Sequence, residues 1–488
     1  MEIETKSGLA GLRAALAVLE GMPGALVTTS APVDPRLELA GVYRQVGAGV
    51  PVKPPTRLGP AMLFENVKGY PGARIATGVL ASRERAARLL GSTPERAAFA
   101  LLEALEHPVE PVLVGRDAAP SQEIAHRAPL DIRRLLPVPT LTAEDAGPYI
   151  CLGLVWARDP ETGESDVTIH RMCVQGADLL SIYFVPGRHI DAFRIKAERA
   201  GKALPVSVSI GMDPAILVAA CFEPPTTPLG LNELTIAGGL RRKPVELVDC
   251  LSVDARAIAD AEYVIEGEIP PGERVREDAL TGLGYAMPEF PGYAGKAQPE
   301  VPVIRVKAVT HRHDPIYQTL VGPAEEHTSL TGIPTEASIM RLASYAMPGV
   351  VRNVYCHPAG GGKYLAIIQV RKTSESDEGR QRQAALIAFA SFSELKQVIL
   401  VDEDVNLFDT NDVLWAMTTR YQGDASTVFI PGVRCHPLDP SASPLFSPSI
   451  RERGVSCKTI FDCTVPWRLR AEFRRPDYAD VDAAKFLP

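Results

Sequence analysis

Four residues of metal-binding and anion-binding type fall in one stretch of the chain. Asp166, His189 and Glu233 offer two carboxylates and an imidazole, and Arg171 offers a planar fork of N–H donors. Carboxylate and imidazole ligands suit a divalent ion such as manganese or magnesium better than a thiolate-loving metal. A guanidinium binds carboxylate and phosphate groups through paired hydrogen bonds. Together these residues predict a divalent metal that clamps a phosphate, beside an arginine that handles a carboxylate.

Two further carboxylates, Glu277 and Glu289, follow in segments that contain proline and glycine. A buried arginine between two glutamates keeps one carboxylate ionised, whereas burial and like-charge repulsion raise the pKa of the other. The protonated glutamate can then act as a general acid. From the residues alone, solvated loop carboxylates are the alternative interpretation.

Periodicity predicts the elements that must position these side chains. Residues 148–310 are strand-rich, with strands predicted at 150–157, 167–174, 179–185 and 206–210. From residue 318 the pattern alternates, with helices at 335–346, 379–395 and 411–420 and strands at 349–356, 364–370 and 397–401. Such alternation is typical of a layered α/β domain. The first hundred residues are also of α/β type, with helices at 9–19 and from Pro94.

Three local motifs admit structural interpretations. Residues 206–214 run from a strand through a glycine turn to an Asp-Pro helix start, which is either an anion site or fold punctuation. His311 and His313 could form a metal pair, but a structural role after a strand is favoured. The glycines at 360–362 precede a strand and no helix, so they predict a tight turn and not a dinucleotide-binding loop.

The overall composition narrows the class of protein. The chain has 488 residues, of which 46% are hydrophobic and 23% charged, and its net charge is −8. These values are ordinary for a soluble protein of roughly two to four domains. We expect no nucleic-acid partner, membrane span or signal peptide, because no basic cluster, long apolar run or basic-apolar N-terminus is present. The eight cysteines are dispersed, which predicts free thiols in a reducing cytoplasm.

A colinear series of motifs connects these residues with a known family. The series is D-x-x-I-x-R at 166–171, Pro186-Gly187-Arg188-His189, Gly211-x-Asp213-Pro214, Asn232-Glu233-Leu234, Glu289-Phe290-Pro291-Gly292-Tyr293, Val401-Asp402-x-Asp404-Val405, Thr419-Arg420 and Leu438-Asp439-Pro440. In this order it resembles the prenylated-FMN-dependent (UbiD-type) decarboxylases, from about residue 145 to 445. One departure is Asp166, where many members have asparagine. The added charge should tighten the divalent metal and slightly repel the phosphate.

The resemblance implies an α/β (α+β) fold in three parts. These are an N-terminal α/β region (1–120), a split β-barrel that binds prenylated FMN and metal (121–317) and a C-terminal layered α/β domain (318–442). A tail (443–488) would contact a neighbouring subunit of a dimer or hexamer. The active site would lie between the last two domains, and a separate flavin prenyltransferase would supply the cofactor.

The resemblance also implies which residues hold the cofactor. Asp166, His189 and Glu233 would ligate Mn2+ or Mg2+, which bridges to the phosphate of prenylated FMN. A K+ ion would lie nearby, held by Glu233 and by backbone carbonyls of residues 222–225. The cofactor would contact Thr168, Ile169, Arg171, Arg188, His189, Glu233 and Lys396. The alternative for Lys396 is a helix-end lysine that favours the helix dipole.

The implied catalytic network is Arg171, Glu277 and Glu289. Arg171 would orient the substrate carboxylate and pair with Glu277, and Glu289 would deliver the proton that replaces carbon dioxide. In most relatives the two glutamates are close in sequence, whereas here residues 278–288 separate them. We interpret this insertion as an enlarged loop at the pocket mouth, either a lid or a specificity element. It leaves Asp278 and Glu273 as alternatives to Glu277.

The implied activity is reversible non-oxidative decarboxylation of an aromatic or heteroaromatic acid through a covalent prenylated-FMN adduct. His327 would line the substrate pocket, as would Leu438, for which core packing is the alternative. A furan, pyrrole or hydroxybenzoate acid is expected. The insertion and His327 favour a polar substrate such as furan-2,5-dicarboxylate. The alternatives are a decarboxylase of a cinnamate-type acrylic acid and a flavin-binding accessory protein without decarboxylase activity.

Overall fold

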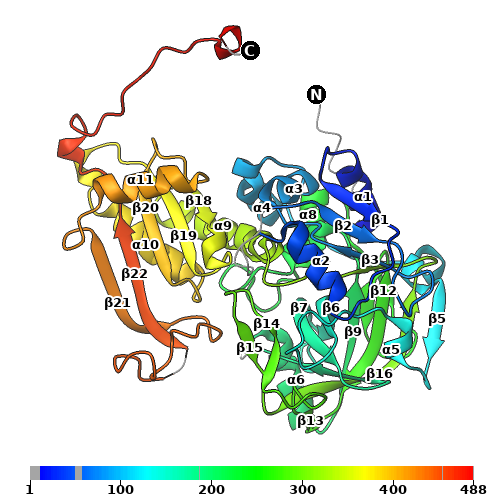
Figure 1. Ribbon diagram of the computed structural model, residues 1–488. Coiled ribbons are helices and arrows are strands. Elements are labelled where there is room, and N and C mark those ends of the chain that lie inside the picture. Colours follow the sequence, from blue (N-terminus) through cyan, green and yellow to red (C-terminus); the bar gives the residue numbers. More distant parts are fainter. Residues whose placement is uncertain (1–10, 50–57, 186, 453, 487–488) are drawn as a thin grey trace.

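Two lobes joined by one long helix, α9 (Glu325–Ala346), make up the molecule (Figure 1). The structure is a computed structural model that describes residues 11–49, 58–185, 187–452 and 454–486. Leu9 of the first predicted helix and Pro186 of one motif lie outside the described residues. The larger lobe combines the N-terminal region with a barrel, and the smaller lobe is the C-terminal domain.

The N-terminal region combines short helices with a four-stranded sheet in the order β1-β2-β3-β17. Its elements are α1 (Gly11–Glu20), β1 (Leu26–Thr29), α2 (Glu38–Gly47), β2 (Ala61–Phe64), β3 (Arg74–Thr77), α3 (Arg83–Leu89), α4 (Ala97–Glu106), β4 (Val112–Leu113), β5 (Ile124–Arg127) and α5 (Ile132–Leu135). Strand β17 (Ile316–Gln318) comes from the far end of the barrel segment and pairs with β3. The first two expected domains therefore share one sheet.

The barrel is a closed sheet of six strands. They are β6 (Tyr149–Arg158), β7 (Ser165–Val174), β8 (Leu179–Ile182), β9 (Leu204–Ile210), β12 (Tyr263–Ile269) and β16 (Val301–His311). Their order is β12-β9-β6-β7-β8-β16, and β16 pairs back with β12. Closure satisfies the backbone groups that an open sheet would leave at its edges. The expected β-barrel is thus confirmed, and every strand predicted in this segment is present.

Shorter elements decorate the barrel. They are α6 (His189–Arg199), α7 (Pro214–Ala219), α8 (Leu234–Arg241), β10 (Glu246–Asp249), β11 (Arg256–Ile258), β13 (Arg274–Val275), β14 (Tyr285–Pro288) and β15 (Ala294–Lys296). At the start of α7, Asp213 accepts a hydrogen bond from the Ala215 amide, and Arg241 donates to the same carboxylate. Because a carboxylate of the chain already caps this helix, the structure supports fold punctuation there over an anion site.

The C-terminal domain is a five-stranded sheet in the order β18-β19-β20-β22-β21. Its elements are β18 (Val351–Cys356), β19 (Leu365–Val370), α10 (Arg380–Ser391), β20 (Gln397–Asp402), α11 (Thr410–Arg420), β21 (Thr427–Arg434) and β22 (Val455–Asp462). Strand β22 lies between β20 and β21 and pairs with both. The predicted boundary at 442/443 is therefore corrected, because residues 455–462 are part of the sheet and not of a tail.

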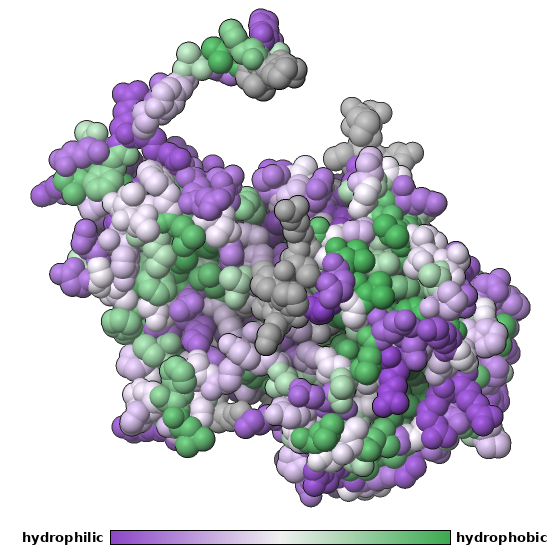
Figure 2. All heavy atoms as spheres, in the orientation of Figure 1, coloured by the Kyte–Doolittle hydropathy of each residue, from purple (hydrophilic) through white to green (hydrophobic). Residues whose placement is uncertain are grey.

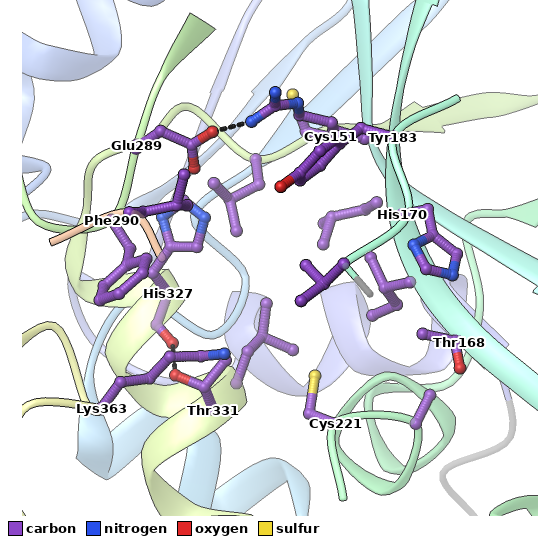
Figure 3. Close-up of a pocket in the computed structure, with 18 of the residues that line it drawn as sticks. Cys151, Thr168, His170, Tyr183, Cys221, Glu289, Phe290, His327, Thr331 and Lys363 are labelled. Atoms are coloured by element: carbon purple, nitrogen blue, oxygen red, sulfur yellow. Dashed lines mark hydrogen bonds and ion pairs between the residues drawn. The ribbon is translucent and has the colours of Figure 1, made fainter. Parts of the chain in front are cut away.

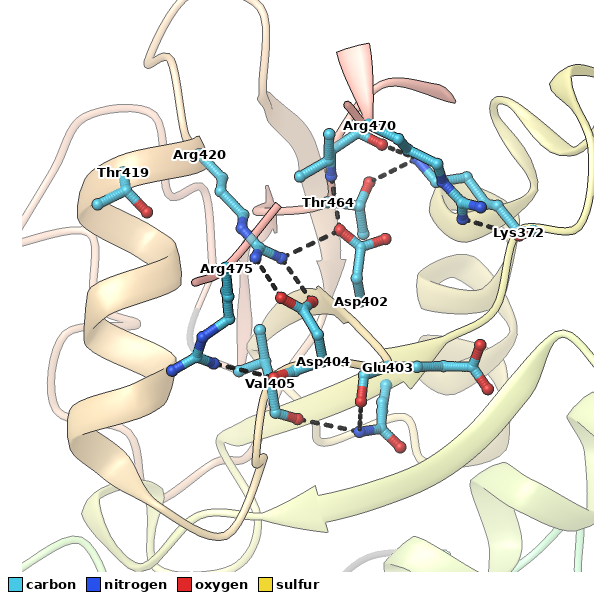
Figure 4. A network of polar contacts seen from close by, with 12 residues as sticks. Lys372, Asp402, Glu403, Asp404, Val405, Thr419, Arg420, Thr464, Arg470 and Arg475 are labelled. Atoms are coloured by element: carbon cyan, nitrogen blue, oxygen red, sulfur yellow. Dashed lines mark hydrogen bonds and ion pairs between the residues drawn. The ribbon is translucent and has the colours of Figure 1, made fainter. Parts of the chain in front are cut away.

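After β22 the chain is tied to the outside of this domain by a network of polar contacts (Figure 4). The Val465 amide donates to Asp402 at 2.7 Å, and Lys372 Nζ donates to the Val465 carbonyl at 2.6 Å. Further along, Arg475 donates to the Asp404 carbonyl. Residues 476–486 extend away from the domain (Figure 1). Within the described part of the chain, the polar contacts with the domain thus end near residue 475.

Two properties expected from the sequence concern the chain as a whole. All eight cysteines are free, as predicted. In the part of the chain that the structure describes, no helix is both long and apolar enough to cross a membrane.

Candidate active site

A pocket lies where strand β7, the loop after α7, helix α9 and the C-terminal domain meet (Figure 3). Its lining combines aliphatic and aromatic side chains with a set of ionisable ones. The residues with charged, imidazole or hydroxyl groups are Thr168, His170, Arg171, Tyr183, Arg188, Glu223, Glu289, His327, Thr331, Lys363 and His436. Apolar walls with a few convergent polar groups are typical of a small-molecule site.

Arg171 bridges the two glutamates at one side of this pocket. Its Nε and Nη2 donate to the two carboxylate oxygens of Glu277 at 2.8 and 2.9 Å, and its Nη1 donates to Glu289. The guanidinium also stacks over the Tyr183 ring, 4.3 Å from its centroid. A bidentate pair and a stacked ring leave the fork little freedom to rotate. The predicted Glu-Arg-Glu arrangement is therefore present as geometry.

Of the three acidic candidates for the first glutamate, Glu277 is the one that contacts Arg171. It is buried and also accepts hydrogen bonds from the Tyr149 hydroxyl and the Gln298 amide. Asp278 instead accepts from Arg276 and from the backbone of the following turn, and Glu273 pairs with Arg305. The alternatives left open by the insertion are thus engaged elsewhere.

Glu289 follows strand β14, in the turn of the hairpin that β14 forms with β15. Burial raises the pKa of the Glu289 carboxyl above its ordinary value, the nearby Glu277 adds to the rise, and Arg171 opposes it. The end of the insertion is therefore an ordered strand that supports Glu289. Its preceding turn exposes Leu280 and Leu283 to solvent.

The three predicted metal ligands lie together at the other end of the same strand. Asp166 on β7, His189 at the start of α6 and Glu233 before α8 each offer a ligand atom, and these atoms lie within 4.8 Å of one another. Glu233 Oε2 is buried without a hydrogen-bond partner. Burial and the adjacent Asp166 carboxylate raise its pKa well above the ordinary value. Two adjacent buried carboxylates are an environment that a divalent ion would satisfy.

Strand β7 separates these two groups by a fixed length. Asp166 and Arg171 are five residues apart on it, which corresponds to about 17 Å at roughly 3.3 Å per residue. Thr168 and Ile169, between them, line the pocket as expected. A single strand therefore carries one of the three predicted ligands, Asp166, and the guanidinium of the pocket at different points along its length.

The pocket wall contributed by the C-terminal domain holds residues that the sequence reasoning missed. Lys363 follows the glycine turn at 360–362, and His436 lies two residues before Leu438. Gly361 has φ +60°, and a Cβ there would lie 2.6 Å from the Phe290 ring. The predicted tight turn is confirmed. The position of this turn next to the Phe290 ring directs Lys363 to the pocket. The signal available in the sequence was a lysine directly after three glycines.

His327 and Leu438 both line the pocket, as predicted. His327 is on the first turns of α9. Burial and the nearby Lys363 lower the pKa of its imidazole to about 4. The ring is held closely, because a Cβ at Gly322 would lie 2.5 Å from His327 Cε1.

Two other predicted residues lie away from this pocket wall. Lys396 Nζ lies 2.7 Å from both Asp439 and Ser441, and it is not among the lining residues. His311 forms no metal pair with His313. Its Nε2 lies 3.1 Å from that of His126 on β5, which supports the structural interpretation.

Three family models of 3-octaprenyl-4-hydroxybenzoate carboxy-lyase match the chain in order. The N-terminal domain model matches residues 21–105, the Rift-related domain model 112–324 and the C-terminal domain model 328–463. The chain belongs to the UbiD family. As a UbiD-family protein it is a carboxy-lyase, and the reaction class is non-oxidative decarboxylation of an aromatic acid.

UbiD-family relatives resemble the chain over nearly its whole length. Gallate decarboxylase from Lactiplantibacillus plantarum is 50% identical over 482 residues, 98% of each chain. The apo structure of a 3,4-dihydroxybenzoic acid decarboxylase from Enterobacter cloacae is 59% identical with a TM-score of 0.94, covering 98% of this chain and 99% of that one. The UbiD-class enzyme HmfF from Pelotomaculum thermopropionicum, solved with FMN, is 38% identical with a TM-score of 0.86, covering 98% and 100%. An evolved dimeric form of HmfF was solved with prFMN.

Proposed function

We propose that this UbiD-family enzyme decarboxylates a benzoate that carries ring hydroxyls, of the dihydroxy- or trihydroxybenzoate class. The observation that carries the proposal is Arg171 held between Glu277 and Glu289 in a pocket whose other wall is polar. That wall offers the imidazoles of His327 and His436 and the cations of Lys363 and Arg188 to ring hydroxyls. The relatives that act on gallate and 3,4-dihydroxybenzoate support this choice over a cinnamate-type or furan acid.

In this proposal Arg171 orients the carboxylate that is lost. The two bonds to Glu277 fix the plane of the guanidinium, which leaves Nη1 directed at Glu289 and the pocket. With positioning of this kind the substrate loses its orientational freedom on binding, so that this entropy loss no longer adds to the activation barrier. Glu277 therefore acts through Arg171, as a positioning residue.

Glu289 is the proposed proton donor. Because its pKa is raised by burial, it keeps a proton to higher pH than an ordinary glutamate does, which suits a general acid. After carbon dioxide leaves, Glu289 would protonate the ring carbon. Ionisation then leaves Glu289 beside Arg171, which stabilises the new carboxylate.

The cofactor proposal is prenylated FMN, anchored by a divalent metal, with Mn2+ as the first choice and K+ nearby. Thr168, Ile169 and Arg171 line the pocket that would hold it, and the Asp166–His189–Glu233 group would hold the metal. When bound, the prenylated flavin supplies an acceptor for the electron pair of the breaking C–C bond. Lys396 stays a predicted phosphate contact that no contact in the structure supports.

We further propose a homo-oligomer in a reducing cytoplasm, with a flavin prenyltransferase as the supplier of the cofactor. The free cysteines support the compartment. Support for the oligomer is the segment after Arg475, which extends from the domain with Tyr478 86% and Phe486 80% exposed. In Figure 2 this segment stands clear of the body and carries hydrophobic residues near its end.

The test is co-expression with a flavin prenyltransferase, followed by measurement of carbon dioxide release. The panel would contain 3,4-dihydroxybenzoate, gallate, benzoate, cinnamate and furan-2-carboxylate. The proposal expects release from the hydroxylated benzoates and little from benzoate or cinnamate. Release from cinnamate alone would favour the acrylic-acid alternative, and release from no acid by flavin-loaded protein would favour the accessory-protein alternative.

A further inference from the structure

Two cations of the pocket wall are each paired with two carboxylates. Arg188 Nη2 lies 2.6 Å from Glu223 Oε1 and 3.8 Å from Glu394 Oε1. Lys363 Nζ lies 3.6 Å from Glu223 Oε1 and 3.4 Å from Glu394 Oε2. We name Arg188, Glu223, Lys363 and Glu394 the wall quartet. Its two positive and two negative charges balance.

The wall quartet is assembled from both lobes. Arg188 precedes α6 and Glu223 follows α7, so both belong to the barrel segment, whereas Lys363 and Glu394 belong to the C-terminal domain. The Glu394 side chain is only 3% exposed and that of Lys363 13%. In such a dry environment each unbalanced charge is costly, so the count of charges decides what can bind.

The histidines beside the quartet add no positive charge. His436 Nε2 lies 3.2 Å from Glu394, and its Nδ1 accepts a hydrogen bond from the Leu438 amide. Burial and Lys363 lower the pKa of His436 well below the ordinary value, and they lower that of His327 as well. Both imidazoles are therefore neutral hydrogen-bonding groups at neutral pH.

The third cation, Arg171, is the one that the proposed function assigns to the carboxylate that is lost, and Glu277 is its charged partner while Glu289 is protonated. Among the described side chains that line the pocket, the permanent cations are Arg171, Arg188 and Lys363. In Figure 3, Lys363 and Glu289, the partner of Arg171, lie at the two ends of the same side of the pocket. A second carboxylate on a substrate would meet cations already neutralised by Glu223 and Glu394. A phenolic hydroxyl needs no counter-charge, because it both donates and accepts hydrogen bonds.

We propose that Glu394, together with Glu223, is a specificity-determining residue that excludes dicarboxylic acids by neutralising Lys363 and Arg188. This inference rests on the proposed function and sharpens its substrate class to acids with one carboxylate and neutral ring hydroxyls. It also argues against furan-2,5-dicarboxylate, which the sequence had favoured.

The test compares two benzoates, 3,4-dihydroxybenzoate and benzene-1,4-dicarboxylate. The first carries ring hydroxyls, and the second carries a second carboxylate opposite the first. Binding is measured by calorimetry on flavin-loaded protein that carries Glu289→Gln in every arm, so that neither acid is turned over. The parent is expected to bind the dicarboxylate at least about tenfold more weakly than the hydroxylated acid. Glu394→Gln frees the charge of Lys363, and we expect the affinity ratio to shift toward the dicarboxylate by about tenfold.

Two controls and a second test variant separate the effect of charge from an effect on folding. Glu394→Asp keeps the negative charge, so it should keep the parent ratio. Glu403→Gln makes the same charge change at a surface glutamate paired with Arg352 and Arg371, and it should also keep the ratio. Glu223→Gln removes the other carboxylate and should shift the ratio in the same direction, which decides the question if Glu394→Gln does not fold.

Two kinds of result overturn the inference. The first is an unchanged ratio in Glu394→Gln and Glu223→Gln while both acids still bind. The second is an equal loss of affinity for both acids, which a merely structural role would produce. A parent that binds neither acid refutes the proposed function and this inference with it, so the two failures are distinguishable.

Discussion

At the scale of single residues, the site depends on how one guanidinium divides its donors. Arg171 donates two N–H groups to Glu277 and one to Glu289. The two carboxylates therefore differ in environment although both contact the same cation. Glu277 accepts two further hydrogen bonds, from Tyr149 and Gln298, whereas burial raises the pKa of Glu289. The proposed roles, positioning for Glu277 and proton transfer for Glu289, rest on that asymmetry.

Glu289→Gln should abolish proton delivery while leaving the substrate bound. Loss of a general acid costs about 10²- to 10⁴-fold in kcat, and glutamine preserves the size of the side chain. The measurement is decarboxylation of 3,4-dihydroxybenzoate by flavin-loaded protein, with binding of the same acid measured separately. Glu273→Gln, which alters a glutamate paired with Arg305 outside the network, is the matched control. Unchanged kcat in Glu289→Gln would remove the assignment.

Asp166→Ala should remove divalent metal from the purified protein. Asp166 supplies one of the two carboxylates in the ligand group, and loss of a direct ligand should weaken Mn2+ binding at least as much as the roughly 10- to 100-fold seen for outer-shell partners. Metal content by mass spectrometry and Mn2+ titration by electron paramagnetic resonance report this without turnover. Asp178→Ala changes an aspartate that is 55% exposed and should retain the metal. Equal metal content in both variants would contradict the site.

At the scale of elements, the glycine turn before β19 links helix α9 to the pocket. Gly362 has φ +73°, and a Cβ there would lie 2.9 Å from the Thr328 carbonyl oxygen on α9. The next residue, Lys363, belongs to the wall quartet. A close approach of two backbones therefore sets where the lysine enters the pocket.

Gly362→Ala should both destabilise the domain and move Lys363. We expect a loss of roughly 1–3 kcal/mol in the free energy of unfolding from the positive φ and the backbone clash. Gly349→Ala is the matched control, because Gly349 has φ +77° in the same domain with no atom within 4 Å of an added Cβ. Urea unfolding of both variants separates the two contributions. The close approach is refuted if both alanines cost the same.

The elements that periodicity failed to predict have identifiable physical causes. Helix α9 begins at Glu325, ten residues before the predicted start at 335. The prediction missed the first turns because Pro334 lies inside the helix. In addition, most of the helix surface is buried, so no one-sided apolar pattern marks it. Strand β22 was missed within a Pro- and Ser-rich stretch. Its Lys458 is buried and donates to the Ser393 and Leu395 carbonyls. A buried charge in a central strand breaks the pattern that marks strands.

At the scale of the whole molecule, the active site belongs to neither lobe alone. The barrel supplies Arg171 and the metal-ligand group, α9 supplies His327, and the C-terminal domain supplies Lys363 and His436. The ionic contacts between Glu223 and Lys363 and between Arg188 and Glu394 cross from one lobe to the other. If these residues select the substrate as proposed, that selection would depend on the approach of the two lobes.

A chain that ends at residue 475 should fold normally but form a smaller or weaker oligomer. The polar contacts of Figure 4 hold the chain up to Arg475. Beyond it, Tyr478, Val481 and Phe486 are 86%, 64% and 80% exposed, and exposed apolar groups of this kind favour burial against a partner. Light scattering over a concentration series measures the assembly, and thermal unfolding checks the fold. An unchanged molecular mass would show that this segment makes no subunit contact.

Residue types, spacing and motif order were enough to predict the family, the reaction class and two groups of side chains that the fold brings together, Asp166–His189–Glu233 and Glu277–Arg171–Glu289. These features depend on residue spacing and on the order of motifs along the chain, so they can be recognised in the sequence alone. That the first group binds a metal stays a prediction. The sequence left Glu277 competing with its neighbours and passed over Lys363, His436, Glu223 and Glu394. Each of these depends on which chain segment folds against which, because the fold brings together residues more than a hundred positions apart, such as Arg171 with Glu277 and Glu223 with Lys363. Charge balance in the pocket is a property of that juxtaposition, and no single segment carries it.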